Sequence, residues 1–304
     1  MLPPSGPSAR RNFSLSVVVP EGPPVTAPEL LAGQCDLSRI ALKDAMQKGA
    51  VWVVPPARRP QRLRRASTRL TAGDELRLHY DSVILGTDAP VARRLADHRR
   101  YSVWFKPAGL MVEGSRYGDH ATLLRQTELG FAPPRRCWLI HRLDREANGL
   151  VLIAHTPDAA ARLSALFQTR TIDKRYLIEV RGRIDGPGST GEWRGDVDGK
   201  PASTFWRVLE SNTDCSRLEI SMATGRHHQI RRHAEAAGHP VLGDPRYGSD
   251  NPHAHGLRLA AVGLAFVDPW SGVPMRFSCE DEVREAWAWN SISVLQATPP
   301  EPRQ

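Results

Sequence analysis

The stretch WLIHRLDREANGLVLIAH, residues 138–155, places a short charged run between two apolar segments. Apolar runs of this length, bounded by polar residues, indicate buried strands. Asp144 follows the first run, so its carboxylate is expected at the mouth of a cleft beside a sheet. A carboxylate there can act as nucleophile or base, and His141, Arg142 and Arg145 are placed to hold it ionised. From this stretch alone, an ordinary turn aspartate in a salt bridge is an equal alternative.

Further strands are expected on both sides of this stretch. Apolar or alternating patterns predict strands near residues 101–105, 137–141, 149–155, 174–181, 203–210, 216–222 and 257–266. One helix is expected from Thr156 to Phe167, and another begins near His228 and ends at Gly238. Residues 183–200 are predicted to form a loop. Many strands with few helices indicate an α+β fold on a mixed, mostly antiparallel sheet.

A small α/β unit is expected before this sheet. Helices are predicted between Ala27 and Lys48, followed by a strand at 50–54 and an alternating strand after the turn at Gly73. Between these strands lie six arginines with no acidic residue among them, which favours contact with phosphate over a solvated loop. They are Arg58, Arg59, Arg62, Arg64, Arg65 and Arg69.

The predicted boundary between the two parts falls near residue 95, after a polar linker. The expected division is a disordered N-terminus at 1–14, a small RNA-binding domain at 15–95, a catalytic domain at 96–292 and a disordered tail at 293–304.

Composition limits the class of protein. The 304 residues include 41 Lys and Arg against 33 Asp and Glu, and the formal net charge of +8 favours a polyanionic partner, nucleic acid before an anionic membrane. The 4 cysteines are isolated from one another, which indicates free thiols in a reducing compartment. No stretch suggests a signal peptide or a membrane span, so a cytoplasmic location is expected.

A second candidate region is TGRHHQIRRHAEAAGHPVLGDPRYG, residues 224–248, which brings Arg226 and Arg231 near the start of a helix, where anions bind. A metal site is not supported, because His228 and His233 lie five apart and ligands on one helix face need a separation of three or four. The chain also lacks a Walker lysine loop, a G-x-G-x-x-G and a G-x-S-x-G motif. No metal and no cofactor are therefore expected.

Four motifs, in this order, resemble the RluA-like pseudouridine synthases. They are FKPAG at 105–109, HRLDREANGLVLIA at 141–154, KRY at 174–176, and TGRHHQIRRH with GHPVLGDPRYG at 224–248. The N-terminal unit resembles the alpha-L RNA-binding module, named after a ribosomal small-subunit protein. The resemblance implies the pseudouridine synthase fold and an isomerase, here expected to be monomeric, that flips a specific uridine out of ribosomal or transfer RNA and converts it to pseudouridine without a cofactor.

The resemblance also implies roles for single residues. Asp144 would be the catalytic aspartate, Tyr176 would stack on the target base and assist the proton step, and Arg231 would pair with Asp144, with Arg226 as the competing partner. Arg142 would enter the RNA stack where the uridine leaves. Further RNA contacts are expected from Lys106, His228, Gln229 and Ile230. It stays open whether the carboxylate attacks the anomeric carbon or removes the neighbouring ribose proton.

The chain departs from the family pattern at a few positions. Ala147 and Asn148 stand where relatives commonly have Thr and Ser, His227 stands for Thr, and Ala260 for His. These changes are expected to affect RNA selection more than chemistry. A non-catalytic RNA-binding protein or ribosome-assembly factor that keeps the fold is the alternative.

Overall fold

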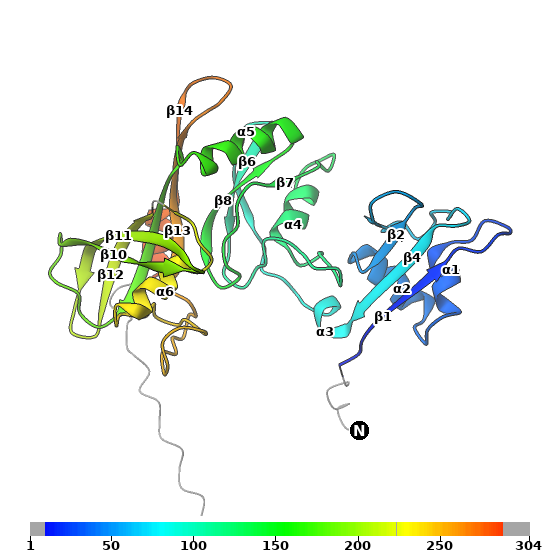
Figure 1. Ribbon diagram of the computed structural model, residues 1–304, viewed down its shortest axis with the longest axis horizontal. Coiled ribbons are helices and arrows are strands. Elements are labelled where there is room, and N and C mark those ends of the chain that lie inside the picture. The colour runs from blue at the N-terminus through cyan, green and yellow to red at the C-terminus, as the bar shows by residue number, and fades with distance from the viewer. Residues whose placement is uncertain (1–9, 223, 288–304) are drawn as a thin grey trace, which may run out of the picture. The chain divides into compact units, whose positions relative to one another are not determined.

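The computed structural model describes residues 10–222 and 224–287, which divide into two compact units (Figure 1). The first comprises the chain up to residue 89 together with 113–129, and the second comprises 90–112 and the chain from 130 onward. The first unit thus ends at residue 89, before the predicted boundary near residue 95. It also includes residues 113–129, which were predicted to belong to the catalytic domain. Among the described residues, no helix is long and apolar enough to cross a membrane.

The first unit is a four-stranded antiparallel sheet with helices, in the strand order β1-β4-β2-β3. Its elements are β1 (Asn12–Val18), α1 (Ala27–Ala32), α2 (Arg39–Gln47), β2 (Val51–Val54), β3 (Gln61–Arg62), β4 (Glu75–Asp81), α3 (Ser82–Leu85) and α4 (Leu123–Leu129). Strand β1 was not expected, and the prediction of disorder is wrong for residues 12–14. Residues 1–9 lie outside the described part of the chain.

Local sequence explains the helices of the first unit. The Ser38 side chain caps α2 by accepting a hydrogen bond from the Ala41 N–H group. Leu42 and Met46 then fall on one face of the helix and are fully buried in the core of this unit together with Leu78 of β4. The helices predicted between residues 27 and 48 are therefore confirmed.

The second unit is built on a ten-stranded sheet. Along its main path the order is β10-β11-β12-β9-β13-β8-β6-β5, while β14 pairs with β13 and β7 with β8. Its strands are β5 (Arg93–Asp97), β6 (Tyr101–Lys106), β7 (Trp138–Leu139), β8 (Asn148–Ala154), β9 (Asp173–Arg181), β10 (Thr190–Val197), β11 (Lys200–Ser211), β12 (Cys215–Met222), β13 (Leu259–Val267) and β14 (Pro274–Ser278). Among the described residues, the pairing is antiparallel except between β8 and β13.

Two segments of this unit differ from the predictions. The polar stretch at 183–200, expected as a loop, contains β10, which pairs with β11 at the edge of the sheet. The expected linker contains β5, which pairs with β6 at the other end of the path. Both strands lie at a sheet edge and keep many exposed positions, so they lack the apolar pattern that marks the inner strands.

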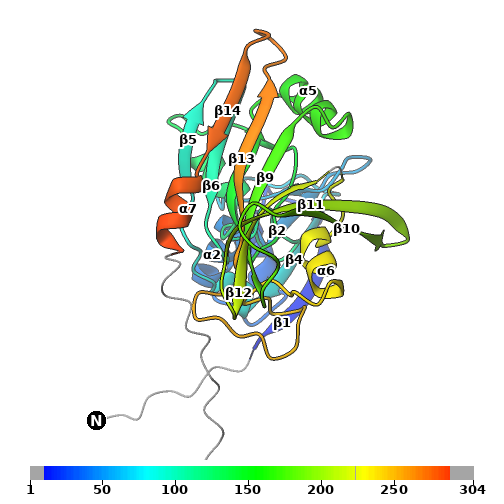
Figure 2. The same ribbon diagram turned by 90° about the vertical axis from the view of Figure 1, so that its left-hand side faces the viewer.

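Three helices complete the second unit: α5 (Pro157–Gln168), α6 (Gln229–Ala236) and α7 (Glu280–Ala286). Helix α5 is capped by Thr156, and its Ala159 and Leu163 are buried beside β6 and β8. Helix α6 packs with Ile230 and Ala234 against the part of the sheet that contains β11 and β12. In the two views, α5 and α6 lie toward opposite ends of the sheet, and the β13–β14 hairpin extends beyond it (Figures 1 and 2).

The parallel pair of β8 and β13 depends on a glycine. Gly149 has a φ of +119°, and a Cβ atom there would lie 2.2 Å from the Ala261 carbonyl oxygen. Only glycine fits this close approach of two backbones. The contact fixes the start of β8, and with it the end of the loop that carries Asp144.

Candidate active site

Asp144 lies in the loop between β7 and β8, and the end of β6 holds this loop. The Gly109 N–H group donates to the Arg145 carbonyl oxygen at 2.8 Å, and Arg145 Nε donates back to the Gly109 carbonyl at 3.2 Å. Within the loop, the Ala147 N–H group reaches the Asp144 carbonyl at 3.3 Å. The backbone from Asp144 to Ala147 is therefore held by the segment after β6 and by a turn of its own.

Lys106, the last residue of β6, is buried and also holds the loop that carries Asp144. Its Nζ donates to the carbonyl oxygens of Pro107 at 3.1 Å, Leu110 at 2.8 Å and Arg145 at 3.1 Å. The residue is 0% exposed, and burial lowers the pKa of the amine to about 8. The prediction that Lys106 contacts RNA is wrong in this structure, because the amine is enclosed and bonded to the loop it supports.

His141 does not act on Asp144 as predicted. Its Nε2 accepts a hydrogen bond from the Leu152 N–H group at 3.0 Å, and its ring stacks on Phe167 with 4.5 Å between centroids. Burial lowers the pKa of His141 to about 3, so the ring is neutral at physiological pH. A neutral ring that accepts a backbone hydrogen bond cannot hold a neighbouring carboxylate ionised.

The partner of Asp144 is Arg231 of α6. Its Nη1 donates to Asp144 Oδ2 at 3.0 Å, while its Nε and Nη2 each donate to one oxygen of Asp244 at 2.7 Å. The side chains of Arg231 and Asp244 are 2% and 0% exposed, whereas that of Asp144 is 24% exposed. One buried guanidinium thus joins an accessible carboxylate to an enclosed one, and Arg231 rather than Arg226 makes the contact.

The charges in this chain of contacts stabilise one another. Burial opposes the charge of Arg231, but hydrogen bonds to Asp244 and Asp144 outweigh it and raise the pKa of the guanidinium. Burial likewise opposes the charge of Asp244, and its bonds with Arg231 and the N–H groups of Arg246 and Tyr247 lower the pKa of that carboxyl. Asp244 is not among the predicted site residues, although it is the acid of the GHPVLGDPRYG motif and a buried arginine requires one.

His228 completes the surroundings of the carboxylate. Its Nε2 lies 3.6 Å from Asp144 Oδ1, and its Nδ1 lies 3.1 Å from the Tyr247 hydroxyl. It precedes α6 with a φ of 55°, a left-handed conformation that is unfavourable for a non-glycine residue. This backbone turn directs the imidazole toward Asp144.

A pocket of about 110 Å³ opens at the Asp144 carboxylate. Tyr176 of β9, Ile230 of α6 and the exposed Arg142 all line it. Burial and the nearby Asp144 raise the pKa of the Tyr176 hydroxyl to about 12, so the phenol stays protonated at neutral pH. The pocket therefore offers a carboxylate, a phenol and an apolar side chain to one small ligand.

Gln229 lies beside this pocket, but its polar atoms are bonded within the protein. Its Oε1 accepts from the Thr224 hydroxyl at 2.7 Å and the Arg226 N–H group at 3.1 Å, and its Nε2 donates to the Ser203 carbonyl at 2.9 Å. The residue is 2% exposed. Gln229 lines the pocket while its amide holds the segment before α6, and an RNA contact of this residue stays a prediction.

The predicted arginine surface of the first unit is partly occupied by the protein itself. Arg62 Nε lies 3.0 Å from Asp119 Oδ2, and Arg64 Nη2 lies 2.5 Å from the same oxygen. The Arg62 guanidinium also lies 4.2 Å from the Trp52 ring centroid. RNA contact stays a prediction for these two paired residues, and four other arginines of the run are exposed: Arg58, Arg59, Arg65 and Arg69.

The departures from the family pattern lie at different places around the site: Ala147 lines the Asp144 pocket, His227 is exposed and stacks on His228 with 3.7 Å between ring centroids, and Ala260 is enclosed in the sheet. Ala147 is 1% exposed and Ala260 is 0% exposed, and Asn148 pairs with Ala260 across β8 and β13. Ala260 is enclosed in the sheet, so its substitution alters packing, whereas Ala147 forms part of the pocket wall. An effect of these positions on RNA selection stays a prediction.

The fold and the site together define the class of protein: a pseudouridine synthase fold whose pocket is centred on a paired aspartate. A family model described as RNA pseudouridylate synthase matches residues 100–236. The dual-specificity RNA pseudouridine synthase RluA of Yersinia pestis is 31% identical over 58% of this chain and 93% of its own length. The chain therefore belongs to the RNA pseudouridine synthase family.

Other relatives share only part of their length. The ribosomal large subunit pseudouridine synthase D of Nitrosomonas europaea is 38% identical over 48% of this chain and 47% of its own length. The chain thus spans about half the length of that curated relative. The solved structure of human RNA pseudouridylate synthase domain containing 1 is 24% identical, covers 63% of this chain and 85% of its own, and has a TM-score of 0.53, which supports the fold.

Proposed function

We propose that this protein converts a uridine in ribosomal RNA to pseudouridine. The observation that carries the proposal is the contact chain from Asp144 through Arg231 to Asp244 at the mouth of a pocket. The names of relatives support the substrate, because that of the Nitrosomonas protein specifies the ribosomal large subunit. Transfer RNA as a second substrate, a monomeric state and a cytoplasmic location belong to the same proposal.

The reaction requires a carboxylate at the ribose and no redox step. The bond from C1′ to N1 breaks, the base turns, a bond from C1′ to C5 forms, the C5 proton leaves and N1 gains a proton. Asp144 serves either as nucleophile at C1′ or as base at the neighbouring ribose carbon, and Arg231 favours its ionised form. Tyr176 stacks on the uracil and holds a proton near the pocket.

The N-terminal unit and Arg142 would handle the surrounding RNA. A uridine inside a stacked RNA must leave the stack, at a cost of roughly a few kcal/mol. Insertion of Arg142 into the gap and phosphate contacts from the exposed arginines of the first unit, such as Arg58 and Arg59, would offset that cost.

Tritium release tests the proposal. The purified protein is incubated with unmodified large-subunit ribosomal RNA of the source organism that carries uridine labelled with tritium at C5. We expect Asp144→Asn to slow the release by at least about a thousandfold, because no other group replaces the lost carboxylate. Asp198→Asn is the matched control, since Asp198 is an exposed carboxylate paired with Arg232.

Turnover by Asp144→Asn close to that of the wild type would refute the role of this carboxylate. A wild-type protein that binds the RNA but releases no tritium would favour the alternative of a non-catalytic RNA-binding or ribosome-assembly protein.

A further inference from the structure

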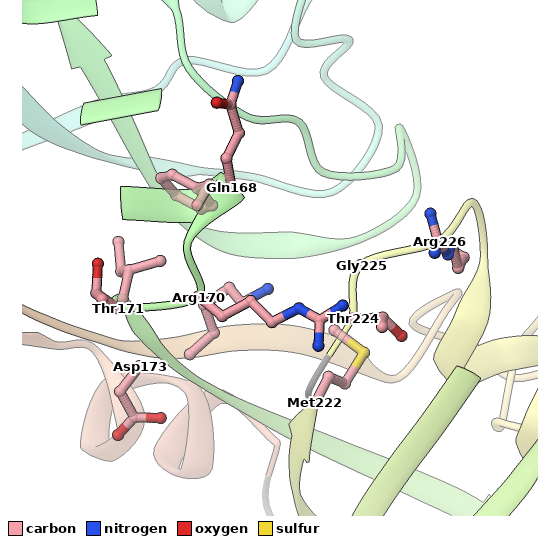
Figure 3. A pocket seen from close by; sticks show the side chains of 11 residues that line it. Gln168, Arg170, Thr171, Asp173, Met222, Thr224, Gly225 and Arg226 are labelled. Atoms are coloured by element: carbon pink, nitrogen blue, oxygen red, sulfur yellow. The ribbon is translucent and has the colours of Figure 1, made fainter. Parts of the chain in front are cut away.

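A second cleft lies beside the Asp144 pocket. It has a volume of about 580 Å³ and is lined by the end of α5, the start of β9 and the segment that leads into α6 (Figure 3). It shares Met222, Gly225 and Arg226 with the smaller pocket at Asp144. A ligand that fills both would be larger than one base.

Three cationic side chains line this cleft: Arg170, Lys174 and Arg226. In Figure 3, the Arg170 side chain extends across the cleft toward Met222 and Thr224. Lys174 reaches the opposite wall, since its Nζ lies 3.6 Å from the position that a Cβ atom on Gly225 would take. We call these three residues the cleft cations.

The cleft cations have no acidic partner within ion-pair distance among the residues that the structure describes. Asp173 also lines the cleft, but Figure 3 shows its carboxylate pointing away from Arg170. Burial and the charge of Arg170 both lower the pKa of Lys174, whereas Asp173 opposes them. Positive charges gathered in one cleft without a carboxylate in ion-pair contact are unfavourable, and an incoming anion would relieve their repulsion.

Two further observations separate the cleft from an ordinary basic surface. Arg226 Nε is buried and has no hydrogen-bond partner in the described structure, which is costly for a donor that an incoming acceptor could satisfy. Arg170 has a φ of 58°, in the left-handed region that favours glycine. Arg170 directly follows Thr169, the C-cap of α5, where a helix commonly ends in this conformation, and the turn carries its guanidinium over the cleft.

We infer that this cleft binds the phosphodiester group next to the uridine that occupies the Asp144 pocket. The inference rests on the proposed function for the identity of the ligand. The shared wall at Gly225 and Arg226 lets one nucleotide chain pass from the pocket to the cleft. The guanidinium groups match the paired oxygens of a phosphate, and Lys174 adds a third positive charge.

The test is a cycle of two changes, one in the protein and one in the RNA. The probe is a fluorescent RNA hairpin with a single uridine in its loop, and its partner carries neutral methylphosphonate linkages on both sides of that uridine. Arg170→Gln with Lys174→Gln removes two cleft cations and leaves Asp144, Tyr176 and Arg231 in place. The matched control removes two exposed arginines that have acidic partners, Arg162→Gln with Arg194→Gln.

We expect the double cleft variant to bind the phosphodiester hairpin about tenfold more weakly, with a salt dependence shallower by about one counterion. The neutral hairpin should bind wild type and variant alike, and the control variant should follow the wild type on both probes. Arg170→Lys with Lys174→Arg should retain the affinity, which excludes loss through misfolding.

Three outcomes would overturn the inference. The double cleft variant could lose equal affinity for both hairpins, it could lose affinity for neither, or the wild type could fail to bind the phosphodiester hairpin. Binding needs no turnover, so the outcome is independent of the tritium assay. A protein that binds as described but releases no tritium keeps the phosphate site and loses the proposed function.

Discussion

Two groups of cationic side chains in this protein differ in what they contact. The paired arginines, Arg62 and Arg64 of the first unit, both meet Asp119 and also donate to backbone carbonyls. The cleft cations of the second unit have no carboxylate partner among the described residues. In the sequence the first group stands out as a charge run and the second is scattered.

The comparison shows that a run of like charges along the chain is a poor guide to ligand binding. A charge that is neutralised within the fold contributes to stability, and a charge left without a partner remains available to a ligand. Arg231 represents a third case, in which the same guanidinium contacts an enclosed aspartate and an accessible one.

The largest effect on stability is expected for the ion pair between Arg231 and Asp244, because it is fully enclosed. Asp244→Asn removes one charge from a buried pair, and we expect the free energy of unfolding of the second unit to fall by about 3–5 kcal/mol. Urea denaturation measures it. Asp198→Asn is the control, because it breaks an exposed pair with Arg232 and should cost about 0–1 kcal/mol. Equal losses for the two variants would contradict the distinction between enclosed and exposed pairing.

Smaller changes in stability and in RNA binding should distinguish the paired arginines from their exposed neighbours. Arg62→Gln with Arg64→Gln should lower the free energy of unfolding of the first unit by about 1–3 kcal/mol and leave the salt dependence of RNA binding nearly unchanged. Arg58→Gln with Arg59→Gln should do the reverse, with a salt slope shallower by about 1–2 and unchanged stability. If the paired arginines flatten the slope without a loss of stability, they bind RNA as the sequence suggested.

The smallest effect is the change in stability with pH that Lys106 causes, because its buried amine is bonded to neutral carbonyl groups. The pKa of Lys106 is about 8 in the folded protein, below the ordinary 10.5. Between pH 8 and pH 10.5 the unfolded chain therefore binds more protons than the folded protein. Because of this difference, the free energy of unfolding increases as pH rises through this range. Relative to Lys106→Met, the stability of the wild type should rise by about 1 kcal/mol from pH 8 to pH 9. Denaturation curves at both pH values check this, and a constant difference would contradict the buried amine.

The sequence predicted the inner strands of the larger sheet because they carry continuous or alternating apolar residues. It also brought Asp144, Tyr176 and Arg231 together, since their motifs match a known family in order. The described structure places these three side chains around one pocket.

The failures have a common physical cause. Asp244, Gln229 and Lys106 all lie in the quoted motifs, but they owe their roles to burial and to partners brought close only by the fold, and the motifs do not report those contacts. Strands β5 and β10 escaped prediction because an edge strand with exposed side chains resembles a loop in composition.

The close approach of Gly149 to Ala261 has a consequence for synthesis on the ribosome. Strand β8 pairs in parallel with β13, which follows it only after four other strands and two helices of the described chain. The loop that carries Asp144 therefore lacks one of its two neighbours until β13 has left the exit tunnel. A nascent chain that has already completed the aspartate, tyrosine and arginine motifs therefore still lacks the β13 partner that fixes the start of β8.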